Sequence, residues 1–400
     1  AITVPDFFSN RFKDDKKILS SISAVMILIF FTVYTASGFA ACGKLFNSLF
    51  GVDYLTAMII SAIVIVAYTT LGGFLAASTS DFIQSIIMSI ALVIVLSYGI
   101  ISVGGFDGVV AHVGDLKGFL SITSTHDGAT NAATPYSVLS IASTLAWGLG
   151  YFGMPHILLR FMAIEDTKKL KLSRRVASVW VVISMSVAVS IGIIGYAMSA
   201  EGVIPNLKDS ETIIVQIAHV LSTHGIIFAI IAGVILAGIL ASTMSTSDSQ
   251  LLAASSSVSE NLLEGVLSLN LSSGVKIVVA RGSVIIISII AMFLASNPNS
   301  SVFQIVSFAW AGFGATFGPV MLFALFWKRS NKYGAISGMV AGGIMIFVWK
   351  FLVRPMGGVL GIYELLPAFI VASIFIVIVS LLTPAPEKEI VDEFESIKNY

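Results

Sequence analysis

Residues 147–155 read WGLGYFGMP, which places three glycines and a proline inside an otherwise apolar stretch. Gly148, Gly150 and Gly153 match the letters of a dinucleotide-binding motif, but no strand precedes them and no βαβ unit surrounds them. Three glycines and a proline in one span instead predict a broken helix. Within a bilayer, broken backbone is tolerated only where it faces protein or a water-filled cavity. Discontinuous helices near the membrane midplane are a sequence indicator of transporter sites.

The composition of the whole chain is that of a membrane protein. Of its 400 residues, 56% are hydrophobic and 11% are charged, whereas soluble domains carry about 25% charged residues. The mean hydropathy is +0.97. The formal net charge is zero, so no basic surface suggests nucleic acid. Cys42 is the only cysteine, which excludes an intramolecular disulfide framework and a cysteine-based metal cluster.

Ten apolar segments are long enough to cross a bilayer, which needs about 20 residues per helix. The sixth is longer than one span, so we expect its end to project from the membrane. A polar connection precedes the fourth segment, and another, around 200–224, contains the pattern of a short amphipathic helix. The segments cover approximately 18–48, 54–77, 80–103, 135–160, 172–198, 226–262, 275–296, 302–327, 332–353 and 362–384.

Lysine and arginine are distributed unevenly between the two sides of these spans. When the ten segments alternate in direction, 17 of the 22 basic residues fall on one side. Cytoplasmic loops carry an excess of Lys and Arg, so we expect both ends of the sequence to be cytoplasmic. The acidic stretch after the last span is predicted to be a solvated, partly disordered tail without chemistry.

Two aromatic residues of the glycine-rich stretch are candidates for solute binding. Trp147 and Tyr151 are four positions apart, so they share a face if the segment stays helical. They could wall a small solute while freed backbone groups and the N-terminus of the next half-helix bind its carboxylate. The alternative is that the glycines allow close helix packing and the aromatic rings fill the core. The residues alone leave both interpretations open.

A stripe of hydroxyls in the sixth segment is a candidate cation site. Ser242, Ser245, Thr246 and Ser249 fall at i, i+3, i+4 and i+7, which is one face of a helix. Hydroxyls suit a hard monovalent cation, because hard cations prefer oxygen ligands. The alternative is that each hydroxyl bonds back to a carbonyl of the preceding turn.

Two carboxylates lie within the apolar segments. Asp248 flanks the hydroxyl stripe, and Asp81 begins the third span. Ionisable residues inside spans are costly and are functional candidates by default, although both could also be hydrated near the headgroups. Near the break, Arg160 is predicted to be an interfacial anchor and His156 a hydrogen-bonded packing residue.

Several stretches of the chain resemble the sodium/solute symporter family, and most of all its bacterial proline-transporting members. The similarity runs the whole length. It is carried by residues 5–7 with 11–12, by 30–38, 68–76, 147–158, 244–246 and 309–314, and by 327–335.

This resemblance implies an all-α polytopic membrane protein with the inverted five-helix-repeat (LeuT-type) transporter fold, which has thirteen spans in the family. The chain has about ten, and its start resembles the loop after the family's third span. It is therefore expected to be N-terminally truncated and to lack the first, broken helix of the first repeat. The expected parts are 1–17, a cytoplasmic loop; 18–103, the remaining helices of the first repeat; 104–134, an extracellular loop; 135–327, the second repeat; 328–384, two additional helices; and 385–400, a cytoplasmic acidic tail.

The resemblance also assigns site residues. Ser245 and Thr246 match the family's side-chain ligands for sodium, and Ser242 occupies a position where a backbone carbonyl contributes. The residues that match the proline pocket are Tyr34, Trp147, Tyr151 and Pro155.

A second cation site is implied by some relatives. Asp81 matches an acidic residue linked to sodium passage at the cytoplasmic end. Together with Ser245, the positions of Asp248 and Ser249 resemble a second sodium site. Asp248 stands where a serine is expected, which leaves open an additional cation site or a simple hydrogen-bonding role.

The expected function is secondary active transport: uptake of L-proline with co-transported sodium by alternating access, in a multi-pass protein of the cell membrane. Another small solute, such as a different amino acid, a carboxylate or a sugar, stays open. A transporter-like sensor domain is a second alternative. A membrane enzyme is disfavoured, because no nucleophile–base pair or metal cluster is apparent.

Overall fold

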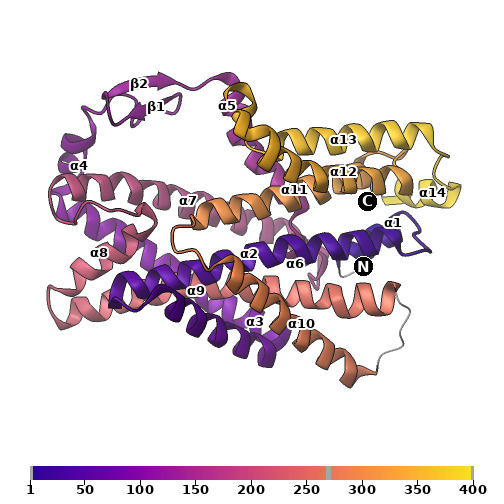
Figure 1. Cartoon of the computed structure of the whole chain (residues 1–400), viewed down its shortest axis with the longest axis horizontal. Coiled ribbons are helices and arrows are strands. Elements are labelled where there is room, and N and C mark those ends of the chain that lie inside the picture. The colour runs from indigo at the N-terminus through magenta and orange to yellow at the C-terminus, as the bar shows by residue number, and fades with distance from the viewer. Residues whose placement is uncertain (1–2, 267–271, 398–400) are drawn as a thin grey trace.

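The structure, a computed structural model, describes residues 3–266 and 272–397 and consists mostly of long helices (Figure 1). In the described part, nine helical segments are long and apolar enough to cross a membrane. They coincide with nine of the ten predicted segments, and the fourth is built from shorter pieces. The nine are Ile18–Phe50, Tyr54–Gly72, Ser78–Ser102, Thr167–Ala200, Ile226–Leu263, Ser273–Leu294, Val302–Phe326, Lys332–Met356 and Leu365–Leu382.

Fourteen α-helices and one small hairpin make up the described chain. The predicted amphipathic helix around 213–221 is present as α8, whereas the predicted loop 104–134 contains α4 and an antiparallel hairpin. The helices are α1 Val4–Arg11, α2 Ile18–Phe50, α3 Tyr54–Ser102, α4 Gly105–Val113, α5 Val138–Leu145, α6 Pro155–Met162, α7 Leu170–Ala200, α8 Ile213–Ser222, α9 Ile226–Ser256, α10 Ser273–Leu294, α11 Val302–Phe326, α12 Lys332–Val348, α13 Leu365–Leu382 and α14 Lys388–Ile397; the strands are β1 Ser124–Asp127 and β2 Ala132–Pro135.

Helix α3 contains two predicted spans in one run of helix, and it folds back on itself. Tyr68 donates a hydrogen bond to the Met244 carbonyl of α9 at 3.0 Å. Further along α3, Ala91 lies against Gly238, only two turns from Met244 on α9. A straight helix would separate Tyr68 from Ala91 by about 35 Å. The two arms of α3 are therefore the second and third spans, as the sequence predicted.

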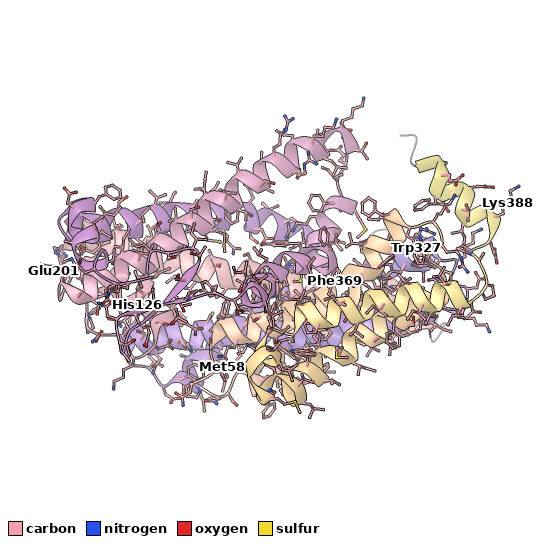
Figure 2. All side chains as sticks on the ribbon, turned by 90° about the horizontal axis from the view of Figure 1, so that it is seen from above. Met58, His126, Glu201, Trp327, Phe369 and Lys388 are labelled. Carbon is pink, nitrogen blue, oxygen red and sulfur yellow. The ribbon has the colours of Figure 1, made fainter. Side chains whose placement is uncertain are left out.

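The connections between helices gather at two opposite ends of the molecule. Glu201 and His126 lie at one end and Trp327 and Lys388 at the other (Figure 2). Both termini lie at the second end, with α1 and α14 (Figure 1). Successive spans therefore run in opposite directions, as the predicted orientation of the chain in the membrane assumes.

Helix α14 corrects the prediction of a partly disordered acidic tail. Its residues Ile390 and Phe394, four positions apart, are 7% and 8% exposed, because they share the apolar face of the helix. The Arg11 guanidinium lies 5.2 Å from the centroid of the Phe394 ring. Arg11 also donates through Nε to the carbonyl of Ala324 at 2.9 Å, one of the last carbonyls of α11 that lack a partner within their own helix. Counting charges alone missed this apolar pair.

Helix α11 is the most enclosed of the nine spans, because 78% of the residues in its most apolar stretch are buried inside the protein. Fully buried phenylalanines pack between it, α2 and α1; they include Phe8, Phe30, Phe31 and Phe313. Many side chains on the outer helices are apolar and exposed, as expected where lipid is the solvent. The broken fourth segment packs against α11, so the core of the protein positions the candidate site.

Candidate functional site

The fourth segment is a broken helix, which confirms the prediction from its glycines and proline. Helix α5 ends at Leu145, and a 3₁₀ helix, η1, continues over Ala146–Gly153. Met154 is extended, with φ −81° and ψ 107°. Helix α6 then starts at Pro155, which lacks an N–H that would in any case have no partner in the first turn.

Two of the three glycines serve close packing against α11. A Cβ on Gly150 would lie 2.0 Å from Nε1 of Trp310, and one on Gly153 would lie 2.2 Å from the carbonyl oxygen of Phe313. A Cβ on Gly148 would meet nothing within 4 Å. The packing interpretation therefore holds for Gly150 and Gly153, and the backbone of η1 approaches α11 directly.

Trp147 and Tyr151 do not share a face, because η1 is a 3₁₀ helix and not an α-helix. With three residues per turn, positions four apart point about 120° from each other. The ring plane of Trp147 is nearly parallel to those of Phe303, Trp310 and Tyr363, and the ring centroids are 5.5, 5.7 and 5.6 Å away. Tyr151 is 44% exposed and meets Trp310 edge-on at 4.8 Å. Trp310 therefore contacts both predicted solute residues.

Tyr34 and Pro155 come together at the start of α6. The ring of Tyr34 lies 6.3 Å from that of His156, which also contacts Phe31 at 5.7 Å. His156 is a packing residue as predicted, but its buried Nδ1 has no hydrogen-bond partner in the described chain. The four predicted solute residues thus form two groups, one around Trp310 and one at the start of α6.

The structure brings together three of the predicted cation ligands. The hydroxyls of Ser245 and Thr246 both donate to the carbonyl of Ser242, at 3.3 and 3.0 Å. These are the back-bonds of the alternative interpretation. They also gather three oxygen atoms on one face of α9.

Arg160, which the sequence predicts to be an interfacial anchor, joins two further candidates. Its Nη2 donates to Oδ2 of Asp81 at 2.5 Å and to Oγ of Ser249 at 3.2 Å. The Asp81 side chain is 15% exposed and that of Arg160 is 46% exposed. Because α6 begins only at Pro155, Arg160 lies in the second turn of a short half-helix that faces α3 and α9.

Asp248 is completely buried, which excludes a hydrated position near the headgroups for this residue. Its Oδ2 accepts a hydrogen bond from the hydroxyl of Tyr68 at 3.0 Å. Its Oδ1 has no hydrogen-bond partner in the described part of the protein. A buried carboxyl oxygen without a partner is costly, so this position has capacity for a further donor or a cation.

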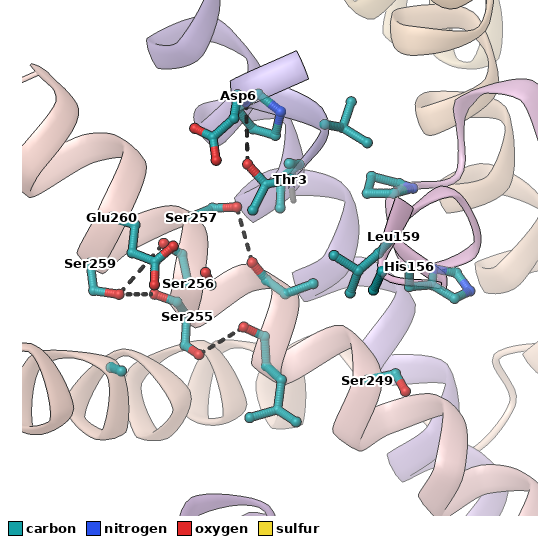
Figure 3. Close-up of a pocket in the computed structure, with 18 of the residues that line it drawn as sticks. Thr3, Asp6, His156, Leu159, Ser249, Ser255, Ser256, Ser257, Ser259 and Glu260 are labelled. Carbon is teal, nitrogen blue, oxygen red and sulfur yellow. Dashed lines mark hydrogen bonds between the residues drawn. The ribbon is translucent and has the colours of Figure 1, made fainter. Parts of the chain in front are cut away.

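A cavity of about 690 Å³ lies between α1, α6 and α9 (Figure 3). Of the predicted site residues, Pro155 and Ser249 line it. The cavity also has polar lining residues, which come from the end of α9, the following π-helix and the region of α1. These polar residues include Ser255, Ser256, Ser257, Ser259, Glu260, Thr3 and Asp6. The cavity leads from the break toward the end of the molecule that holds the termini.

Four contact residues of the site were not among the sequence candidates. Tyr68 and Trp310 lie in stretches that carry the family resemblance, so a signal existed for them. No sequence signal pointed to Phe303 or Tyr363. Both are ordinary aromatic residues at helix ends, and only the packing shows that they contact Trp147.

Comparisons with known proteins support the transporter interpretation. A profile of the sodium:solute symporter family matches residues 1–342. The osmoregulated proline transporter of Bacillus subtilis is 40% identical over 97% of this chain and 75% of its own length. The high-affinity proline transporter of the same organism is 41% identical over 100% of this chain and 80% of its own. The sodium/proline symporter of Haemophilus influenzae is 38% identical over 99% and 77%.

A solved structure supports the fold independently. A Na⁺-coupled sialic acid symporter in a substrate-bound outward-open state matches with a TM-score of 0.73 at 16% identity, over 96% of this chain and 78% of that one. The fold is therefore the predicted inverted-repeat fold. The profile match and the relatives near 40% identity show that this chain belongs to the sodium:solute symporter family.

Proposed function

We propose that this protein takes up proline together with sodium by alternating access. The observation that carries the proposal is the set of relatives near 40% identity over almost the whole chain, which are named proline transporters or sodium/proline symporters. The geometry is consistent with such a protein at two places, the hydroxyl stripe of α9 and the break before α6.

Sodium is the co-transported ion in this proposal, and Ser245 and Thr246 are its side-chain ligands. Their hydroxyls share the Ser242 carbonyl as acceptor, so each oxygen keeps lone pairs for a hard cation. The ion then passes toward Asp81 and Ser249, which Arg160 holds together. Asp248, with its unpartnered oxygen, is a candidate for a second cation site.

The solute binds at the break in this proposal. Helix α6 starts without a side-chain cap, so its positive end can attract a carboxylate. Trp147 and Tyr151, arranged around Trp310, offer ring faces and edges to an apolar pyrrolidine ring. Tyr34 and Pro155 supply the opposite wall from α2 and from the start of α6.

The orientation is part of the proposal. We place the end with both termini in the cytoplasm, because it carries most of the lysines and arginines. Inward movement of one sodium ion across a potential of 100 mV then contributes about 2.3 kcal/mol.

The test is uptake of labelled proline into vesicles that carry the complete gene product, with an inward sodium gradient or with potassium in its place. We expect uptake that requires sodium. Sodium-dependent uptake of another solute, with none of proline, would keep the family mechanism and reject proline. A panel of amino acids, carboxylates and sugars as competitors identifies the solute in that case.

A further inference from the structure

The connection between α12 and α13 places one aromatic residue against the broken helix. The ring of Tyr363 lies 5.6 Å from that of Trp147, with the two planes 18° apart. Tyr363 lies outside the ten helices of the two expected repeats, in the part of the chain predicted to be additional. An additional element thus contacts a predicted solute residue directly.

Tyr363 is held in this place from three directions. Its backbone N–H donates to Oγ of Ser143 on α5 at 2.7 Å. Its hydroxyl donates to the carbonyl of Ser307 on α11 at 2.7 Å. With the ring on Trp147, one residue bridges α5 and η1, which precede the break, and α11, on which η1 packs.

The next residue ties the connection to the turns that extend α12. Glu364 is fully buried, and its carboxylate pairs with Arg354 at 2.6 Å and with Lys350 at 3.4 Å. A buried carboxylate is tolerated only with such partners. Trp349 adds a hydrogen bond from its indole N–H to the carbonyl of Ile362 at 3.3 Å. The backbone that carries Tyr363 is therefore anchored on both sides of the residue.

We propose that Tyr363 is a positioning residue of the solute site, which fixes the ring of Trp147 and thereby helps to set the affinity for the transported solute. The inference rests on the proposed function, since it takes Trp147 as a wall of the solute site. Tyr363 acts through Trp147 and does not itself touch the solute. Tyr363→Phe keeps the ring contact and loses the hydroxyl bond, and Tyr363→Leu removes the ring.

The first test separates the apparent KM for the solute from the maximal rate. Tyr363→Leu should raise KM for proline about three- to tenfold, the size expected for loss of an aromatic pair. The half-saturating sodium concentration should stay within about twofold. Tyr363→Phe should stay close to the wild type in KM. Tyr333→Leu, which changes a 54% exposed tyrosine of α12, is the matched control and should leave KM unchanged.

A purely structural role gives a different result. If Tyr363 only tied α13 to the core, Tyr363→Leu would lower the maximal rate or the amount of protein and leave KM unchanged, which overturns the proposal. The double variant Trp147→Leu with Tyr363→Leu should show no larger KM than Trp147→Leu alone, because one residue acts through the other. Independent, multiplying effects on KM would also overturn it.

A second readout needs no solute, so it separates this inference from the proposed function. The chain has five tryptophans, and replacing Trp180 and Trp327 by Phe leaves the two in the aromatic stack and Trp349, which stays because it holds the connection. In this background, Tyr363→Leu should make the fluorescence easier to quench with acrylamide, and Tyr363→Phe should not. Unchanged quenching overturns the positioning role, whatever is transported. Increased quenching in a protein that transports a different solute supports the positioning role and moves the KM test to that solute.

Discussion

At the scale of single residues, the carbonyl of Ser242 accepts two hydroxyls that the sequence singled out. This carbonyl also accepts the N–H of Thr246 within helix α9, so Ser245 and Thr246 share its remaining capacity and both bond without leaving α9. This explains how a stripe of hydroxyls is stable inside an apolar helix when no ion is bound. The hydroxyl oxygens keep their lone pairs in these bonds, so only an ion that binds the Ser242 carbonyl itself must compete with the two hydroxyl bonds, of about 1 kcal/mol each.

Removing either hydroxyl should affect sodium more than solute. Ser245→Ala and Thr246→Ala are each expected to raise the half-saturating sodium concentration about tenfold, because one oxygen ligand and about 1.4 kcal/mol of binding free energy are lost. Trp147→Ala should instead raise the apparent KM for proline. The measurement is uptake as a function of sodium in reconstituted vesicles. Equal sodium curves for all three variants would reject the ligand assignment.

The glycines of η1 provide a matched pair of variants. Gly150→Ala places a Cβ 2.0 Å from Nε1 of Trp310, whereas Gly148→Ala places one in open space. We expect Gly150→Ala to destabilise the protein by about 1–3 kcal/mol and to reduce transport, and Gly148→Ala to do neither. Thermal unfolding in detergent, followed by size-exclusion chromatography, measures the difference. Equal melting temperatures would show that η1 does not pack on α11 in this way.

Periodicity predicted which side chains share a helix face, but it does not reach pairs that are distant in sequence. The stripe from Ser242 to Ser249 follows from spacing alone. Tyr68 and Asp248 are 180 positions apart, and Asp81 and Arg160 are 79 apart. Such pairs depend on how α3, α6 and α9 pack, so spacing along the chain could not connect Arg160 with Asp81.

At the scale of elements, one carboxylate ties the segment before α8 to the start of α11. Glu211 accepts hydrogen bonds from the N–H groups of Val302 and Phe303, both at 3.0 Å, and from Oγ of Ser301 at 2.7 Å. Lys44 of α2 donates to it at 2.7 Å. The carboxylate therefore satisfies free N–H groups at the positive end of α11.

The ionisation of Glu211 should give a pH-dependent stability. Burial alone would raise the pKa of Glu211, but hydrogen bonds from Lys44, Phe303, Ser301 and Val302 together lower it to about 2. A carboxyl group with a lowered pKa stabilises the fold above its ordinary pKa near 4.5, and this stabilisation is lost as the pH falls toward 2. Glu211→Gln should therefore lower the melting temperature by a constant amount between pH 6 and 8, about the usable range of reconstituted protein.

The difference between Glu211→Gln and the wild type should shrink when melting curves are extended from about pH 5 to about pH 3. Asp209→Asn is the control, because Asp209 shares Lys44 at 2.8 Å but makes no contact with the start of α11 among the interactions described. A difference between Glu211→Gln and wild type that stays unchanged down to pH 3 would contradict the capping role.

The elements predicted best were those with a strong local signal. Apolar length predicted the spans, and glycine with proline predicted the break at Met154. The 3₁₀ form of η1 was not predicted, because it follows from close backbone packing at Gly150 and Gly153. The sequence predicted two separate helices where α3 runs without interruption. Composition does not distinguish two helices joined by a loop from one helix that bends sharply.

At the scale of the whole molecule, α14 connects the C-terminal end to the N-terminal helix. Lys13 pairs with Glu389, and Lys328 pairs with Glu395 at 3.0 Å. The carboxylates of both pairs are largely exposed, so each pair contributes little to stability and is weakened by salt. Phe394 adds a contact with Arg11 that salt weakens less, since its ring is buried.

Docking of α14 should therefore depend on ionic strength. In a protein without Cys42, the pair Lys13→Cys and Glu389→Cys removes one ion pair and leaves Lys328–Glu395. The two cysteines should form a disulfide readily at low salt and about two- to fivefold more slowly at 1 M salt, where a Debye length of about 3 Å screens the remaining pair. Adding Phe394→Ala should slow disulfide formation further at every salt concentration, whereas Asp392→Asn, on the exposed face, should not. Rates that do not depend on salt or on Phe394 would show that α14 is not docked.

The fold could be predicted at this scale because a lipid solvent permits few architectures. Composition, ten apolar segments and the alternation of basic residues together required a helical membrane protein. The contact between α14 and α1 depended instead on two apolar residues in an acidic stretch, and charge counting gave them no weight.

The one cysteine of the chain lies where α2 meets α9. Cys42 is 1% exposed, and its sulfur is 3.5 Å from Oγ1 of Thr243, the residue after Ser242. A thiol reagent can reach it only when the two helices separate. The rate at which Cys42 is alkylated therefore measures how often α2 and α9 separate beside the hydroxyl stripe, and no cysteine has to be introduced for the measurement.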